Sequence, residues 1–87
     1  MKVTDIKIEK IGLFHFYLVD KMTGETAFAE FKNIPKNIAV NLINQYIDGF
    51  NLVNKIQSVD IIDTSKIGTW IDIETDMHLL RFYLFKN

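Results

Sequence analysis

The chain reads Leu13-Phe14-His15-Phe16-Tyr17-Leu18-Val19 near its N-terminus and Leu79-Leu80-Arg81-Phe82-Tyr83-Leu84-Phe85 near its C-terminus. In both stretches apolar side chains occupy odd and even positions alike, which is typical of strands that are buried on both faces. Only one segment nearby has the spacing of a helix, and one helix covers one face of a small sheet. We therefore expect the other face to be sheltered by curling of the sheet or by a second copy of the chain.

Length and composition indicate one folded domain that spans residues 1–87. Hydrophobic residues make up 48% of the 87 residues and aromatic residues 13%, well above the range of disordered chains. The formal net charge of −1 removes the usual reason to expect bulk attraction to nucleic acid or to an anionic membrane. The chain has no cysteine and no apolar run long enough to span a membrane, so we expect a cytoplasmic protein without a disulfide, a zinc–thiolate site or a cofactor.

The N-terminal third of the chain has the pattern of three strands. Between Val3 and Lys10 apolar and polar residues alternate, which predicts a half-buried edge strand. Gly12 interrupts the pattern and predicts a bulge or a tight hairpin. The stretch from Asp20 to Glu25 predicts a turn, in which the aspartate bonds to nearby backbone and Gly24 adopts the left-handed conformation. A return strand is expected over residues 26–32.

The middle of the chain has helical spacing. A helix is expected from Pro35 to Asp48, with Asn33 capping free amides at its start and Gly49 ending it. Polar residues such as Asn44 are expected on its solvent side. The opposite, apolar stripe consists of Ile38, Leu42, Ile43, Tyr46, Ile47 and Phe50.

Three further strands are expected after the helix, over residues 56–63, 67–74 and 78–86, with turns at 64–66 and 75–77. The predicted order is therefore β-β-β-α-β-β-β. This order favours an α+β fold, in which an antiparallel sheet of five to six strands packs one face on a single helix.

Acidic residues gather between Ile56 and His78, where five carboxylates stand against the single Lys66. The ordinary interpretation of such a cluster is a solvated surface. Carboxylates fixed on a sheet beside Trp70 can also mimic phosphates and occupy a basic groove of another protein, with charge governing encounter and the aromatic ring governing residence. On this hypothesis the partner-binding residues are Asp60, Asp63, Trp70, Asp72, Glu74 and Asp76.

The aromatic strands predict two further kinds of surface. For a homodimer, we expect the oligomer interface to contain Phe14, Phe16, Phe82 and Phe85. The alternative is a sheet that stacks the bases of single-stranded nucleic acid on the rings of Phe14, Phe16, Tyr17, Phe82, Tyr83 and Phe85. Only Arg81 lies among these rings. Because phosphate contacts normally supply most non-specific affinity, nucleic acid is the less favoured partner.

Few residues offer catalytic or metal-binding chemistry. His15 has no predicted nucleophile or orienting carboxylate beside it, so no catalytic residue is assigned. Asp72, Glu74, Asp76 and His78 follow one another at two-residue steps, the spacing of one strand face. Such residues lie about 6.5 to 7 Å apart, too far for all four to reach one ion at about 2.0 to 2.6 Å. No metal site is therefore assigned, and a small metal-dependent enzyme is the least favoured alternative.

These observations favour a non-catalytic protein-binding module rather than an enzyme. Nine lysines against one arginine, with thirteen isoleucines and seven asparagines, are typical of an AT-rich genome. Together with the small size, this composition suggests an inhibitor or modulator encoded by a phage or another mobile element. The expected partner is a protein with a basic surface.

Overall fold

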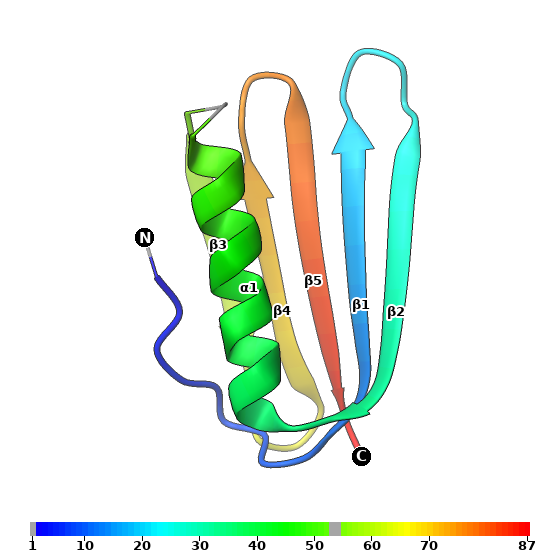
Figure 1. Cartoon of the computed structure of the whole chain (residues 1–87), viewed down its shortest axis with the longest axis vertical. Coiled ribbons are helices and arrows are strands. Elements are labelled where there is room, and N and C mark those ends of the chain that lie inside the picture. Colours follow the sequence, from blue (N-terminus) through cyan, green and yellow to red (C-terminus); the bar gives the residue numbers. More distant parts are fainter. Residues whose placement is uncertain (1, 53–54) are drawn as a thin grey trace.

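The computed structural model describes residues 2–52 and 55–87 as one antiparallel sheet and one helix. The elements are β1 (Ile11–Asp20), β2 (Thr26–Ile34), α1 (Lys36–Asn51), β3 (Ser58–Asp63), β4 (Gly68–Glu74) and β5 (His78–Lys86). The spatial order of the strands is β2-β1-β5-β4-β3, and every neighbouring pair is antiparallel. Figure 1 shows α1 running along the β3–β4 side of the sheet, with β1 and β2 beyond it. The predicted α+β class is confirmed, with five strands.

The sequence predicted an edge strand between Val3 and Lys10, and this prediction is wrong. Val3, Ile6 and Ile8 are buried as the apolar pattern requires, but the segment pairs with no strand of the described chain. A side chain of the helix takes the place of strand-to-strand backbone hydrogen bonds at Val3. Asn44 on α1 accepts a hydrogen bond from Val3 N at 2.8 Å and donates one to Val3 O at 2.7 Å. The apolar alternation therefore predicted burial of this segment correctly but did not predict strand pairing.

Two turn features agree with the sequence. Oδ1 of Asp20 accepts hydrogen bonds from the backbone N–H groups of Met22 at 2.9 Å and Thr23 at 3.2 Å. Gly24 has a φ of 77°, the left-handed conformation that closes the turn between β1 and β2. The pairing of β1 with β5 shifts register on either side of Gly12, so the predicted bulge is confirmed.

The helix differs from its prediction at both ends. It begins at Lys36 after Pro35, and no side chain caps it, while Asn33 instead has a φ of 51° at the end of β2. It runs through Gly49 to Asn51. A glycine inside a helix costs only about 1 kcal/mol of helix stability relative to alanine. The packing of Phe50 on the ring of His78 and on the core outweighs this cost, so the helix continues beyond Gly49.

The core lies between α1 and one face of the sheet. Its largest fully buried apolar side chains come from the N-terminal segment, β1, α1, β4 and β5: Ile8, Ile11, Phe14, Ile43, Ile47, Ile71, Ile73, Leu80, Phe82 and Leu84. Three of the four aromatic residues predicted for an oligomer interface lie in this core: Phe14, Phe16 and Phe82 are buried within one chain. They are not accessible to a second molecule, so the predicted interface is wrong for these three residues. Phe85 lies on the opposite face.

Candidate functional site

The candidate site is the face of the sheet that points away from α1, here called the open face. It carries the odd-numbered side chains of β5 and of β1 from Leu13 onward, and the even-numbered side chains of β3, of β4 and of β2 up to Lys32, as the strand register requires. Before the bulge at Gly12, Ile11 lies in the core, and its partner Ile34 packs against the core. No element of the described chain lies over it (Figure 1). Nine of its side chains are apolar or aromatic: Leu13, Tyr17, Val19, Phe28, Ile62, Trp70, Leu79, Tyr83 and Phe85.

One row of the open face is mainly aromatic. The register places Glu30, His15, Tyr83, Trp70 and Ile62 side by side across the five strands. Nε2 of His15 lies 2.8 Å from Oε2 of Glu30. The His15 ring is also enclosed by aromatic edges from neighbouring rows, with ring centroids 5.3 to 5.5 Å away. The expectation that no carboxylate lies beside His15 is therefore wrong, because Glu30 on the neighbouring strand orients its ring. No nucleophile of the described chain bonds to the ring.

The adjacent row is aromatic at one end and charged at the other. It contains Phe28, Tyr17, Arg81, Asp72 and Asp60. Nε of Arg81 lies 3.5 Å from Oδ1 of Asp72, and neither atom has a hydrogen-bond partner in the described chain. Burial raises the pKa of Asp72, and Arg81 only partly opposes this effect. Asp72 is therefore an imperfectly satisfied carboxylate beside the aromatic part of the open face.

The open face holds four of the six predicted partner-binding residues: Asp60, Trp70, Asp72 and Glu74. Asp63 faces the other side, where it accepts hydrogen bonds from Thr69 Oγ1 at 2.8 Å and from Lys7 N at 3.1 Å. Asp76 lies in the turn between β4 and β5 and bonds to Gln57. The structure thus assigns Asp63 and Asp76 to local contacts rather than to the acidic surface.

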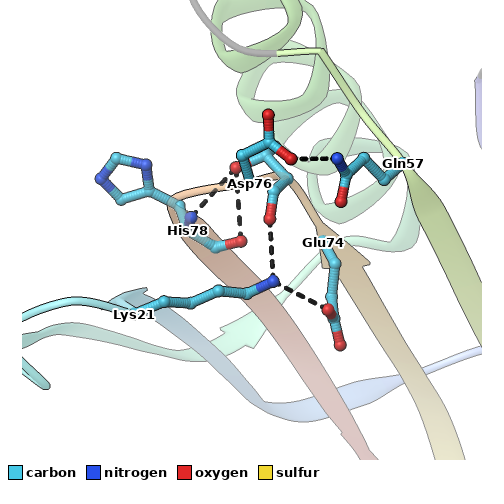
Figure 2. Close-up of polar contacts among 6 residues, drawn as sticks. Lys21, Gln57, Glu74, Asp76 and His78 are labelled. Carbon is cyan, nitrogen blue, oxygen red and sulfur yellow. Dashed lines mark hydrogen bonds and ion pairs between the residues drawn. The ribbon is translucent and has the colours of Figure 1, made fainter.

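Basic side chains of the same protein partly neutralise the acids that remain. Nζ of Lys21 lies 2.8 Å from Oε2 of Glu74 and also donates to the carbonyl oxygen of Thr75 at 2.8 Å (Figure 2). The Lys21 ammonium holds the pKa of Glu74 below its usual value. With Arg81 beside Asp72, two of the three acids on this part of the open face have a cation within the chain.

The acidic row considered for a metal ion is not brought together. His78 faces α1, and its ring packs edge-on against Phe50 with centroids 5.3 Å apart, whereas Asp72 and Glu74 lie on the open face. Figure 2 shows the His78 ring directed away from Glu74 and Lys21. Among residues 2–52 and 55–87, no three histidine or acidic side chains are grouped closely enough to hold a metal ion.

Two hollows interrupt the open face, one on each side of Tyr83. The first is lined by Ile62, Trp70, Asp72, Tyr83 and Phe85. The second is lined by Tyr17, Val19, Thr26, Arg81 and Tyr83. Hollows of this lining suit apolar or aromatic side chains of a partner, with one charged group at the margin of each to orient them. Sequence reasoning missed Ile62 and Val19 as parts of this surface, and it named Tyr17 only for the nucleic-acid alternative.

Comparison with known protein families, with curated proteins and with solved structures finds no match to this chain. No helix in the described part of the chain is long and apolar enough to cross a membrane.

Proposed function

We propose that this protein is a non-catalytic module that binds another protein through the open face of its sheet. One observation carries the proposal: nine apolar or aromatic side chains share a face over which no described element lies. Large apolar patches on the surface of a soluble protein commonly mark a binding site. Following the composition, we place the protein in the cytoplasm as an inhibitor or modulator encoded by a phage or another mobile element.

The hollow beside Trp70 is the proposed anchor point. Aromatic residues in a hollow provide most of the binding energy of typical interfaces, and surrounding charged residues provide selectivity and rate of encounter. Here Trp70, Tyr83 and Phe85 supply the rings, and Asp60 and Asp72 lie in the row next to them. This arrangement favours a partner that inserts an apolar side chain and presents a basic residue at its margin.

Single-stranded nucleic acid fits the open face less well. Stacked bases need nearby cations for their phosphates. The cations Arg81 and Lys21 are already paired with Asp72 and Glu74, and these carboxylates repel phosphate on the same face. Lys32 remains at the β2 margin, next to Glu30.

Two neighbouring isoleucines provide a matched test. Ile61 and Ile62 are 49% and 54% exposed, but Ile62 lies on the open face and Ile61 on the opposite one. A partner is first isolated with the unmodified protein and identified, and its dissociation constant is then measured for each variant. Ile62→Lys is expected to weaken binding at least about tenfold, whereas Ile61→Lys should change it by less than about twofold.

Trp70→Ala should weaken the same partner more strongly still, because it removes the largest ring of the hollow. Circular dichroism and melting temperatures establish that each variant remains folded. Equal losses for Ile61→Lys and Ile62→Lys, or no loss for either Ile62→Lys or Trp70→Ala, would exclude the open face as the binding surface.

A further inference from the structure

The outer edge of β2 differs from the outer edge of β3. β2 has nine residues, ends before Pro35 and has only β1 as a neighbour in the described chain. β3 has six residues, two of them aspartates, and Asp63 at its end is bonded to the N-terminal segment. Short strands, charged side chains and covering segments are the usual means of blocking unwanted edge pairing. β3 is short, carries only acidic charges and is contacted by the N-terminal segment. β2 is long, its edge is uncovered within the described chain, and its two charged residues, Glu30 and Lys32, have opposite signs.

The backbone groups that β2 presents outward can be identified. The N–H of Asp20 donates to Glu25 O, on the β2 side, and the N–H of Lys21 donates to Met77 O, on the β5 side. Successive backbone N–H groups at this end of β1 therefore point alternately toward β2 and β5. The register then turns the backbone groups of odd-numbered β2 residues toward β1. Those of Phe28, Glu30 and Lys32 point away from the sheet, where they can pair with a further strand.

We propose that this edge pairs antiparallel with β2 of a second copy of the chain, with Phe31 on the two-fold axis. This centre places Glu30 opposite Lys32 of the second copy and, by symmetry, Lys32 opposite its Glu30. A centre at Glu30 would oppose two carboxylates, and a centre at Lys32 would oppose two ammonium groups. The charge pattern of the edge therefore selects Phe31, because oppositely charged cross-strand pairs stabilise antiparallel strands and like-charged pairs destabilise them.

The local contacts leave both charges available for this pairing. Lys32 is exposed, and its Nζ lies 3.9 Å from Oε1 of Glu30 within the chain, which is a loose contact. The other oxygen of Glu30 points to His15. Oε1 can therefore accept from the Lys32 of a second copy, and the paired residues 30 and 32 would both direct their backbone groups across the new interface.

Charge reversal tests the pairing in solution. The unmodified protein is expected to sediment as a dimer with a concentration-dependent monomer fraction. Lys32→Glu places four carboxylates at the interface and should raise the dissociation constant of the dimer about tenfold or more. The double variant Glu30→Lys/Lys32→Glu restores complementary pairs and should recover the dimer. Lys66→Glu, an equal charge change in an exposed loop, should leave association unchanged.

Amide hydrogen exchange distinguishes edge pairing from stacking of two open faces. In an edge-paired dimer the amides of Phe28, Glu30 and Lys32 exchange slowly, and they become fast in Lys32→Glu. Two results would overturn the proposal: a protein that is monomeric at every concentration, or a dimer in which these three amides exchange rapidly and charge reversal has no effect. A monomer would leave the open face accessible to a partner, whereas a dimer of stacked open faces would cover it. The isoleucine pair tests separately whether the open face binds a partner.

Discussion

Replacement of Asn44 by leucine is expected to release the start of the N-terminal segment, around Val3, and cost about 2 kcal/mol of unfolding free energy. Asn44 lies on the buried side of α1, although its polarity predicted the solvent side. Its side chain makes two hydrogen bonds to the backbone of Val3. Leucine has the same branched shape, is not smaller and has a higher helix propensity, so neither a cavity nor a weaker helix contributes to the expected loss.

The magnitude follows from two competing responses. If Val3 stays in place, its N–H and C=O groups remain buried without partners, which costs about 1–3 kcal/mol for each group. If Val3 leaves the surface of α1, the backbone is hydrated but one valine side chain is exposed, which costs about 1.5–2 kcal/mol. The second response is cheaper. It stops before Ile6 and Ile8, because exposing each of these fully buried side chains would cost a further similar amount.

Urea denaturation measures the difference, and Asn41→Leu is the control. Asn41 lies one turn earlier on α1 and is exposed. Its replacement should change stability by less than about 0.5 kcal/mol. The amide of Val3 should also exchange faster in Asn44→Leu. A variant that is as stable as the unmodified protein, with Val3 exchange unchanged, would refute the assignment of these two hydrogen bonds as the attachment of the segment.

Three further outcomes are expected. Gly68→Ala should destabilise the fold by about 3 kcal/mol or more in urea titration, because a Cβ would run into the carbonyl oxygen of Leu84; a loss below 1 kcal/mol, roughly, would contradict this. Gly49→Ala, which meets no neighbouring atom, should instead stabilise α1 by about 0.5–1 kcal/mol, and a lower stability would show an unrecognised constraint there. Asp72→Asn should raise the melting temperature near pH 7, since burial raises the pKa of Asp72 despite the nearby Arg81 and the ionised form therefore opposes folding. That advantage should shrink as the pH falls through the raised pKa and vanish below the ordinary value of 3.8, and a lower melting temperature at pH 7 would refute it.

The strands and their turns could be predicted because their signals are local. Alternation, apolar runs and the Asp20–Gly24 turn each depend on residues close together in the chain. The strand predicted for the N-terminal segment does not form, and the reason is physical. Burial of Ile6 and Ile8 needs only an apolar surface, whereas a strand also needs a free edge at the right place, and Asn44 on α1 supplied the backbone partner instead.

The faces of the strands were harder to assign, because β1 and β5 are apolar at odd and even positions alike. On β4 the assignment is plain: Ile71 and Ile73 face α1, and Trp70 faces away. The pairing across the following turn carries this assignment to β5. Thr75, Asp76 and Met77 separate the ends of β4 and β5, as the sequence predicted. Thr75 N donates to His78 O, which puts Glu74 opposite Leu79. The turn residues alone did not reveal this pairing, so the faces of β5 stayed undecided and Phe82 was proposed for the surface that Tyr83 occupies.

Edge pairing and partner binding are compatible because they use different groups. In the proposed dimer, a two-fold axis normal to the sheet would join the two copies of β2 through backbone groups and keep both open faces on the same side, with both helices on the other. The dimer would then present two hollows beside Trp70 to one surface, and a partner with two sites would gain from effective concentration as well as from contact. Stacking of two open faces would have the opposite consequence, since it would bury Trp70, Tyr83 and Phe85 against a second copy and exclude the partner. The free edge of β2 therefore bears directly on whether the aromatic face is available.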